Sequence, residues 1–400
     1  MSEVVLNDIC ELIVDCPHST AYDEGTGYPL VRTPNIGRGR LIYSGMHRVC
    51  EEVYNKRNAR AIPQTNDLIF AREATAGNVA LIQEGEKVCL GQRTVLIRPN
   101  ANLVNPAFLT YHLLAPEQQY KLLSTANGAT VAHVNMPTIR NLKLSLPPLA
   151  TQHRIATILS RYDSLIENYQ KQIKLLEEAA QRLYKEWFVD LRFPGHENTK
   201  ILDGVPEGWE KKKISDVCET VGGGTPSTKV PAYYKGGRIK WVTPTDITRN
   251  NCICLLDTDK KITEEGLRNS STKMVPAGTI LMTSRASVGY FGIADFEVCT
   301  NQGFISCIPI PNMQMYLLFN LMSRVDEIRQ KAGGSTYLEI SKSVFRNFDI
   351  VCPSEIILLQ FQDKASLVLK KEKTLSLQLR LLTEARDRLL PKLMSGEITV

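Results

Sequence analysis

Two long stretches of this chain carry apolar residues at alternating spacings of three and four, and this pattern constrains the fold more than any other feature. The first stretch lies within residues 147–193 and has no Pro or Gly inside its periodic part. Such a spacing predicts one long helix, on the order of 60 Å, whose apolar stripe needs a partner helix. The seam positions are Ile155, Leu159, Tyr162, Ile166, Tyr169, Ile173, Leu176, Ala180, Leu183 and Trp187.

The partner helix is predicted within the same chain, at residues 353–400. A shift of 206 positions, the separation of Ala179 and Ala385, places the first seam on the second from Phe361 onward. A matching register of this kind indicates two copies of one unit. The second seam consists of Leu358, Phe361, Ala365, Val368, Glu372, Leu375, Leu379, Leu382, Arg386, Leu389 and Leu393.

The segments before the two helices repeat as well. LNDIC at Leu6 matches ISDVC at Ile214, and KVCLGQ at Lys87 matches EVCTNQ at Glu297. An alignment of IFAREATAGNVALI with ILMTSRASVGYFGIA pairs Arg72 with Arg285. The offset drifts between 206 and 213, as insertions in surface loops around a shared core produce. Each half is therefore predicted to be a globular domain followed by a helix of fixed register.

These patterns predict an α+β fold in which two similar globular domains are joined by two long helices. We expect the helices to pack as an antiparallel coiled coil and the halves to be related by a pseudo-twofold axis. A helix is also expected at about residues 106–123, where a Pro stands at the start. The predicted divisions are a first domain at 1–146, a central helical region at 147–193, a linker at 194–209, a second domain at 210–352 and a distal helical region at 353–400.

Composition narrows the class of protein. Hydrophobic residues make up 43% of the chain and charged residues 22%, a globular balance, and the formal net charge of +6 permits a polyanionic partner without requiring one. The N-terminal sequence and the lack of long apolar runs lead us to expect a soluble, cytoplasmic protein with no membrane contact. The ten cysteines form no CxxC pair, so we expect buried thiols in place of disulfides or a zinc site.

The motifs of several enzyme classes are missing from the sequence. There is no GxxxxGK[ST] phosphate loop and no [DNS]PP[YF] adenine methyltransferase signature. The GGGTPS run at Gly222 lacks the GxGxxG spacing and is read as a plain loop. The six histidines are scattered and support no acyl-transfer triad. We therefore predict no catalytic residue, no metal site and no cofactor in this chain.

A duplicated unit of domain and helix presents two similar but non-identical surfaces a fixed distance apart. A ruler of this kind suits a long, linear ligand with approximate dyad symmetry, and duplex DNA is the commonest one.

Several segments resemble the specificity subunit of type I restriction-modification systems. They are LPPLATQHRIATIL at Leu146, LLEEAAQRLYKEWF, VPEGWE, SVGYFGIADFEVCTNQGF at Ser287 and ARDRLLPKLMSGEI at Ala385. The resemblance covers the whole chain and is strongest in the helices. Two departures are that nothing like VPEGW precedes the first domain, and that Glu372 and Arg386 put charge on the distal seam.

The resemblance implies that this subunit catalyses nothing itself. Each domain would read one part of a bipartite site in double-stranded DNA, and the helices would set the gap of unread base pairs. The same helices would dock two methylation subunits, which carry S-adenosylmethionine and modify adenine. Restriction subunits, with ATP and Mg, would join this core.

Phosphate contacts by Lys and Arg supply affinity for DNA, and side chains on base edges supply specificity. For any one of these candidate side chains the alternative is a solvated charge on an ordinary loop, and for Arg72 and Arg285 it is an internal salt bridge. The candidates are Arg32, Arg38, Arg40, Arg48, Arg57, Arg60 and Arg72 in the first domain, and Tyr233, Lys235, Arg238, Lys240, Thr245, Arg249 and Arg285 in the second.

Two rival hypotheses come from other classes of protein. A coiled-coil scaffold with two protein-binding heads would share the helices but gives no reason for basic, aromatic loops to recur. A fused nuclease or methyltransferase would need a cofactor motif that the sequence lacks.

The charged outer faces of the helices are either solvated or a docking surface. They include Arg154, Arg161, Asn168, Lys174, Arg182 and Lys185 on the first helix and Lys364, Lys370, Lys371, Arg380 and Arg388 on the second.

Overall fold

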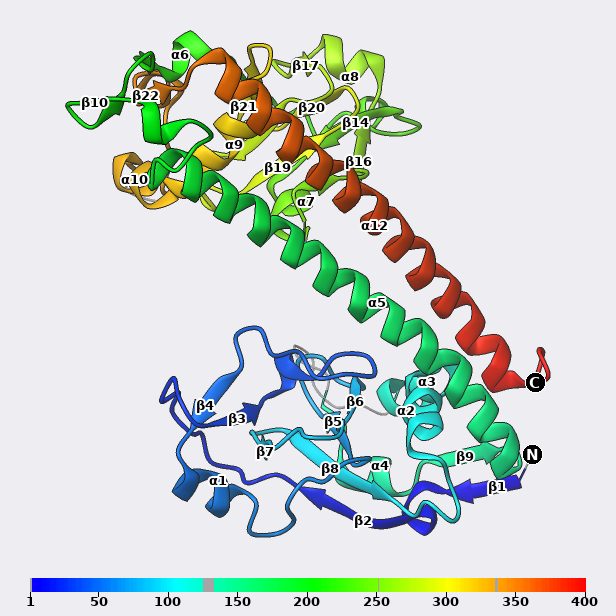
Figure 1. Cartoon of the computed structure of the whole chain (residues 1–400). Helices are drawn as coiled ribbons and strands as arrows, with labels where there is room; N and C mark the ends of the chain where they lie inside the picture. Colours follow the sequence, from blue (N-terminus) through cyan, green and yellow to red (C-terminus); the bar gives the residue numbers. More distant parts are fainter. Residues whose placement is uncertain (1, 125–132, 251, 335–336) are drawn as a thin grey trace. The chain divides into compact units, whose positions relative to one another are not determined.

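The computed structural model describes residues 2–124, 133–250, 252–334 and 337–400 (Figure 1). Backbone contacts divide the chain into two units. Unit 1 consists of Met1–Ile166 and Leu382–Val400, and unit 2 consists of Glu167–Leu381. Each unit therefore contains one globular part and a portion of both long helices.

The globular part of unit 1 is built on two small sheets. Their strands are β2 (Cys10–Asp15), β3 (Tyr28–Val31), β4 (His47–Val49), β5 (Leu68–Ala71), β6 (Val79–Leu81), β7 (Cys89–Leu90) and β8 (Thr94–Pro99). The first sheet is antiparallel in the order β2-β8-β5-β6, and the second has the order β4-β3-β7 with β3 and β7 parallel. Strand β5 is apolar at every position because its alternate residues enter two different hydrophobic clusters.

A third pair of strands closes the globular part of unit 1. Strand β1 (Ser2–Val5) lies antiparallel to β9 (Lys143–Leu146), which directly precedes the first long helix. The helices of this part are η1 (Leu6–Ile9), η2 (Thr33–Asn35), α1 (Glu51–Arg57), α2 (Pro106–Leu114), α3 (Pro116–Ser124) and α4 (Met136–Arg140).

The single helix expected at 106–123 is wrong in one respect, because the structure has two helices there. Ala115 is extended, with φ −66° and ψ 145°, and ends α2. A proline disfavours helical geometry in the residue before it, so Pro116 breaks the helix and begins α3.

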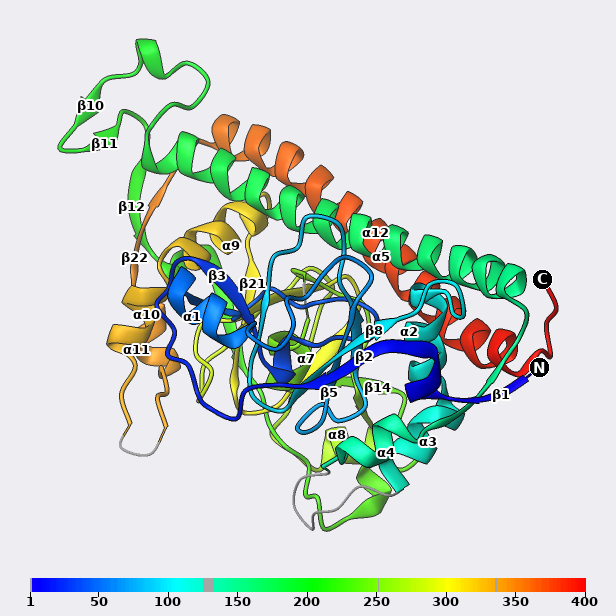
Figure 2. The same cartoon turned by 90° about the horizontal axis from the view of Figure 1, so that it is seen from below.

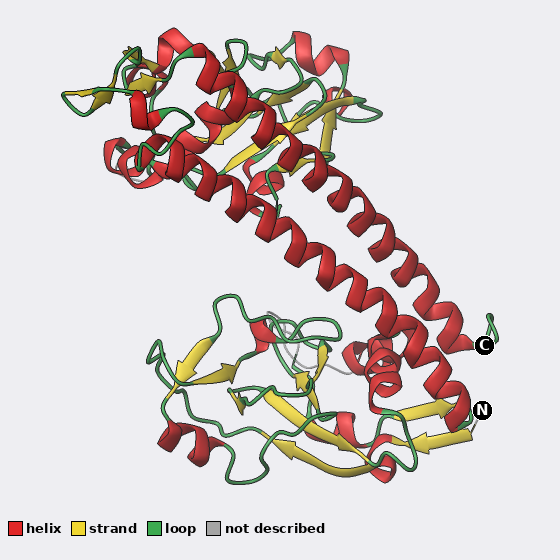
Figure 3. Cartoon of the chain, in the orientation of Figure 1, coloured by secondary structure: helices red, strands yellow, loops and turns green. Residues whose placement is uncertain are grey.

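The globular part of unit 2 has more strands but a similar plan (Figure 3). The strands are β12 (Glu210–Lys213), β13 (Cys218–Gly222), β14 (Ile239–Val242), β15 (Cys254–Leu255), β16 (Lys260–Ile262), β17 (Met274–Val275), β18 (Ile280–Thr283), β19 (Phe291–Ala294), β20 (Val298–Thr300), β21 (Phe304–Pro309) and β22 (Asp349–Cys352). The helices are α6 (Ile214–Val217), η5 (Pro231–Tyr233), α7 (Pro244–Thr248), α8 (Glu264–Arg268), α9 (Gln314–Ser323), α10 (Val325–Lys331) and α11 (Lys342–Arg346).

The strand order of unit 2 reproduces that of unit 1. Its first sheet has the order β13-β21-β18-β19-β15, whose first four members match β2-β8-β5-β6. Its second sheet has the order β16-β14-β20-β17, in which β14 and β20 are parallel as β3 and β7 are. The pair β12 and β22 takes the place of β1 and β9. The repeat read from the sequence is thus present in the topology.

The segment expected as a linker at 194–209 holds some structure of its own. It contains η4 (His196–Asn198) and a short hairpin of β10 (Ile201–Leu202) and β11 (Val205–Pro206). The residues that flank the hairpin, Phe193 and Trp209, are buried with their ring centroids 4.9 Å apart. Both ends of the segment are therefore anchored in the core of unit 2.

The two long helices are α5 (Leu149–Tyr184), which continues into a π-helical turn at Lys185–Val189, and α12 (Glu355–Ser395) (Figure 2). In unit 1 the seam residues Leu159 of α5 and Leu393 of α12 share a hydrophobic cluster. In unit 2 Trp187, in the π-helical turn after α5, packs on Phe361 of α12, with the ring centroids 6.0 Å apart. The apolar seam faces the core in both units, as its spacing predicts. No helix in the described ranges is long and apolar enough to cross a membrane.

Both charged positions on the distal seam have partners inside their own unit. In unit 1 an Arg386 Nη1–H donates to Asp163 Oδ1 at 2.8 Å, and the Tyr111 hydroxyl donates to Asp163 Oδ2 at 2.6 Å. In unit 2 the Glu372 carboxylate accepts the Cys254 N–H at 2.9 Å. Each charged seam residue of α12 therefore bonds to a neighbouring segment of its own unit, Arg386 to α5 and Glu372 to the backbone at Cys254.

Glu372 stands beside a second carboxyl group, that of Glu177 on α5. Glu177 Oε1 accepts the Ile253 N–H at 2.8 Å. Burial and the neighbouring Glu372 carboxylate raise the pKa of Glu177 to about 7. Burial also raises the pKa of Glu372. The thiols of Cys252 and Cys254 face the same pair, and burial raises their pKa values too, so they add no charge near neutral pH.

Replacing Glu177 by Gln tests this carboxyl pair. Between its ordinary pKa of 4.5 and the folded value of about 7, the folded chain holds a proton that the unfolded chain releases, so the free energy of unfolding falls as the pH rises through this window. E177Q keeps an acceptor for the Ile253 N–H and removes the charge. We expect a higher melting temperature than wild type at pH 8 and little change at pH 5. For a unit of this size, a gain of one kcal/mol in the free energy of unfolding raises the melting temperature by about 2–4 °C.

The matched control is E178Q, because Glu178 is the next residue on α5 and pairs only with exposed Lys174 and Arg182. E178Q should leave the melting temperature nearly unchanged at both pH values. An E177Q variant that melts earlier than wild type at pH 8 would contradict the interpretation of the pair.

Candidate functional site

Backbone carbonyl oxygens of the same domain accept hydrogen bonds from four exposed or half-buried arginines among the predicted DNA-binding residues of unit 1, and also from the buried Arg57 and Arg72 described below. Such bonds hold a guanidinium in place without neutralising its charge, so these side chains keep their attraction for an anion. The donor–acceptor distances are 3.2 Å from Arg32 to Gly45, 3.0 Å from Arg38 to Leu114, 2.8 Å from Arg48 to Gly27 and 3.2 Å from Arg60 to Asp15. Arg40 is half-buried nearby.

Arg57 is placed differently, inside the domain. It is only 5% exposed and donates to the carbonyl oxygens of Leu90 at 2.6 Å and Ser19 at 3.0 Å. Burial lowers the pKa of its guanidinium. These contacts favour a structural role for Arg57 over contact with DNA.

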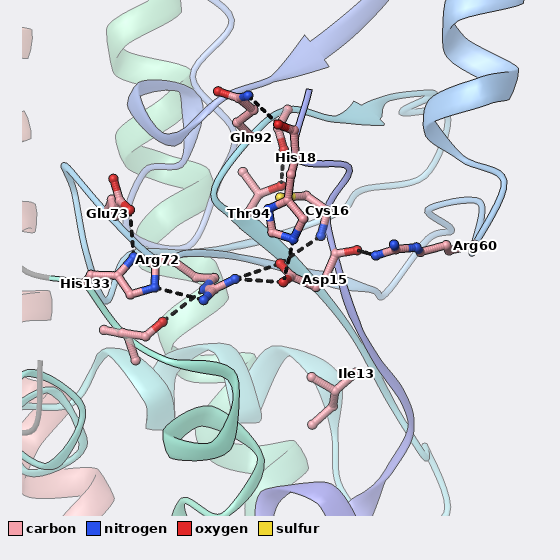
Figure 4. A network of polar contacts seen from close by, with 12 residues as sticks. Ile13, Asp15, Cys16, His18, Arg60, Arg72, Glu73, Gln92, Thr94 and His133 are labelled. Atoms are coloured by element: carbon pink, nitrogen blue, oxygen red, sulfur yellow. Dashed lines mark hydrogen bonds and ion pairs between the residues drawn. The ribbon is translucent and has the colours of Figure 1, made fainter. Parts of the chain in front are cut away.

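Arg72 is the centre of a buried polar network (Figure 4). It is 8% exposed, and its Nη1 donates to both carboxylate oxygens of Asp15 at 2.8 and 2.9 Å. Its Nε donates to Val134 O at 3.0 Å, and its Nη2 lies 2.9 Å from His133 Nε2. The internal salt bridge weighed as an alternative for Arg72 is therefore what the structure shows.

The same network assigns the protons of His133. An arginine has only donors, so His133 Nε2 must accept from Arg72. The other ring nitrogen, Nδ1, then carries the hydrogen and donates to Glu73 Oε1 at 2.7 Å. The imidazole therefore links Arg72 to Glu73.

The pairing of Arg72 with Arg285 is wrong. The Arg72 N–H donates to Arg93 O at 2.9 Å, and the bond in the same place of unit 2 runs from Ser284 N–H to Gly303 O at 2.8 Å. The next turn repeats too, since Ala74 and Ala286 have φ values of 58° and 59°. Ser284 therefore takes the place of Arg72, and Arg285 takes the place of Glu73. A slip of one residue turns a strand side chain to the opposite face, which is why the aligned arginines differ so much in exposure.

The predicted residues of unit 2 lie mostly at the surface. Tyr233 is half-buried in η5, whereas Lys235, Arg238, Thr245 and Arg249 are exposed. Lys240 on β14 lies 3.3 Å above the Phe296 ring and 3.5 Å from an Asp257 oxygen. Arg249 borders a separate hollow of about 250 Å³ beside α5 and α12. The structure thus spreads these residues over more than one site.

Arg285 borders a hollow of about 340 Å³ among the loops of unit 2. Its Nε lies 3.5 Å from Glu339 Oε2, and both side chains are 48% exposed. The other lining residues are Pro244, Ala286, Asn301, Gln302, Gly303 and Tyr337. The arginine, the two amides and the phenol make this hollow rich in hydrogen-bonding groups.

One exposed arginine of unit 1 was missed by the sequence reasoning. The Arg93 side chain is 61% exposed, and its Nη1 lies 2.7 Å from Glu73 Oε2. Its φ of 63° is uncommon for a residue other than glycine. The sequence did contain a signal for this residue. Arg93 directly follows the segment KVCLGQ, and Gly303 follows the matching segment EVCTNQ in the second half.

Comparison with known proteins assigns the chain to a family. The model of the type I restriction modification DNA specificity domain matches residues 1–178 and again residues 206–366. The chain belongs to this family. The two matched segments also bear out the expectation of two copies of one kind of domain, built of mixed helix and sheet.

Individual relatives agree with the family. The HindI specificity subunit of Haemophilus influenzae is 26% identical over 369 residues, which cover 76% of this chain and 80% of the relative. The MjaIX specificity subunit of Methanocaldococcus jannaschii is 39% identical over 153 residues, 38% of this chain and 35% of the relative. The crystal structure of a type I S subunit from M. genitalium shares the fold, with a TM-score of 0.61 at 16% identity over 98% of this chain and 95% of that one.

The prediction of a type I specificity subunit is confirmed by these matches. Specificity subunits are the non-catalytic members of such systems, so the chain is not itself the enzyme. The DNA-binding role of each predicted residue stays a prediction. Within the described residues no group of His, Cys, Asp and Glu is arranged to hold a metal ion, and all ten cysteines are free.

Asp15→Asn tests the structural role of the Arg72 network. The change removes the charge that pairs with a mostly buried guanidinium. We expect the free energy of unfolding to fall by about 1–3 kcal/mol, less than for a fully buried pair because Asp15 is partly exposed. Thermal unfolding followed by circular dichroism measures the effect. Asp8→Asn, at an exposed carboxylate of η1, is the control, and equal melting of the two variants would rule the network out as a stabilising element.

Proposed function

We propose that this chain reads a bipartite DNA site as the specificity subunit of a type I restriction-modification complex. Units 1 and 2 would each read one half-site. The observation that carries this proposal is the repeated strand order of the two units, combined with different charged side chains at equivalent loop positions. A shared scaffold with different loops suits two half-sites of different sequence.

The long helices would serve as the spacer between the half-sites. Helix α5 is continuous over 36 residues and α12 over 41. Contacts inside each unit pair rising positions of α5 with falling positions of α12, as with Glu177 and Glu372 followed by Trp187 and Phe361. This supports an antiparallel coiled coil and a pseudo-twofold relation between the halves.

The outer faces of the helices would dock two methylation subunits, which bring S-adenosylmethionine. Restriction subunits, with ATP and Mg, would join the complex. In support, Lys174 and Arg182 are about four-fifths exposed, and each forms an ion pair with Glu178, at 3.9 and 3.5 Å. A hollow of about 540 Å³ beside this face offers both apolar and charged groups. It is lined by Glu178, Gln181, Arg182, Tyr184, Lys185, Val189, Phe319, Met322 and Ser323.

A binding experiment with duplex DNA tests the proposal against the protein-scaffold alternative. The complex of this chain with its methylation subunits is mixed with random-sequence duplex at two salt concentrations. We expect binding at low salt that weakens steeply at higher salt, because phosphate contacts release counterions. Methylation subunits alone are the control. If the complex does not bind duplex at low salt, the scaffold hypothesis is favoured instead.

A heptad insertion tests the spacer role. Seven residues added at equivalent points of α5 and α12 keep the seam in register and lengthen the pair by about 10 Å, about three base pairs of duplex. Sequencing of methylated DNA should show both half-sites unchanged and a wider gap between them. An insertion in α5 alone breaks the register and should abolish site-specific methylation. An unchanged gap in the double insertion would exclude the helices as the ruler.

A further inference from the structure

The two units carry different ionisable groups at the same pair of backbone positions. The Val134 N–H donates to Arg72 O at 3.0 Å in unit 1, and the Ile340 N–H donates to Ser284 O at 2.9 Å in unit 2. The residues next to these bonds therefore correspond, so His133 matches Glu339 and Glu73 matches Arg285. An acid facing an imidazole in unit 1 becomes an arginine facing an acid in unit 2.

A third position completes the comparison. Arg93 in unit 1 corresponds to Gly303 in unit 2, because both carbonyl oxygens accept the equivalent strand N–H. In unit 1 the guanidinium of Arg93 reaches back to Glu73. In unit 2 the glycine has no side chain, and the hollow beside Arg285 includes this glycine in its lining. Different backbone positions thus supply the arginine in the two units.

The outcome is alike in both units despite the exchange. Each presents one arginine that is about half exposed or more and that lies within ion-pair distance of one carboxylate on a neighbouring loop segment. The pairs are Arg93 with Glu73 at 2.7 Å and Arg285 with Glu339 at 3.5 Å. A matched arrangement reached through different residues indicates a common task at this place on the domain.

The neighbouring carboxylate favours contact of the arginine with a base edge over contact with a phosphate. A phosphate is bound mainly by net positive charge, and a paired carboxylate cancels that charge and repels the phosphate. A base edge is read by the geometry of donors, and a carboxylate that holds the guanidinium leaves its remaining N–H groups in a defined direction. The bidentate contact of arginine with guanine O6 and N7 in the major groove is the commonest of this kind.

We propose that Arg93 in unit 1 and Arg285 in unit 2 each read the major-groove edge of one guanine in their half-site, with Glu73 and Glu339 as positioning residues. In unit 2 the amides of Asn301 and Gln302 line the hollow beside the guanidinium and contact the same base or its neighbour. This inference rests on the proposed DNA-reading function and adds residues and a base to it.

The test uses the full complex with methylation subunits and a duplex pool in which every half-site position is randomised. Bound duplexes are sequenced for wild type, R285A, R285K and R93A. We expect R285A to lose discrimination of about 5- to 150-fold at one position of one half-site, and R93A to do so in the other half-site. R285K should lose it as well, because lysine keeps the charge but not the two-pronged geometry.

The control is R192A, at an exposed arginine beyond the end of α5 in unit 2, which should keep the wild-type preference. A uniform loss of affinity in R285A that R285K restores would identify a phosphate contact and overturn the inference. So would unchanged preferences in R285A and R93A. If R285A fails to fold, R285K and E339Q provide the test. E339Q should weaken the discrimination between bases at the same position of the half-site.

Different outcomes contradict the proposed function and the role of the two arginines. A wild-type complex without any sequence preference would overturn the proposed function itself. A wild-type complex with a bipartite preference that none of the arginine variants alters would overturn only this inference.

Discussion

The packing of α5 against α12 is the interaction on which the rest of each unit depends. Its apolar seam is long and regular, and a regular seam alone permits slipped registers. The polar exceptions remove that freedom. In unit 1 Arg386 pairs with Asp163, which also accepts from the Tyr111 hydroxyl, whereas in unit 2 Glu372 lies beside Glu177 and the two carboxyl groups accept the N–H groups of Cys254 and Ile253. Moving either helix by one heptad would bury an arginine or a carboxylate without its partner, at a cost of several kcal/mol.

The two polar seams are also different in kind. Unit 1 uses an ion pair of opposite charges, and unit 2 uses two carboxyl groups that share a site and hold backbone N–H groups. Neighbouring titratable groups thus make the two ends chemically distinct although the apolar frame repeats.

Sequence reasoning succeeded where periodicity is imposed by physics and failed where it is not. The helical seams and the repeat follow from the spacing of apolar residues and from matching segments in the two halves. The slip between Arg72 and Arg285 arose because loop residues after a strand have no periodic constraint, and one inserted residue exchanges the faces. The break at Ala115 was detectable, since Pro116 is visible in the sequence, but a proline at a helix start and one inside a helix look alike without the backbone.

The candidate site was harder to predict than the fold. In the sequence, Arg57 and Arg72 cannot be told apart from Arg48 or Arg238. Only the tertiary contacts show that the side chains of Arg57 and Arg72 are buried and bonded inside the domain. Arg93 was overlooked because its counterpart is a glycine. Side chains that read different bases must differ between the halves, so a search for residues shared by the halves selects against them.

The β1–β9 ladder has a consequence for how such a chain tolerates change. Its two strands bring the first and last residues of the globular part of unit 1 side by side, directly before α5 begins. Strands β12 and β22 do the same before α12. The chain between the two paired strands leaves and returns to the same place, so its length and sequence can vary while the long helix still starts from the same point. The sequence offsets record this, since they wander in the loops and return to 206 at β9 and β22. Each globular part is therefore replaceable as a cassette on an unaltered frame.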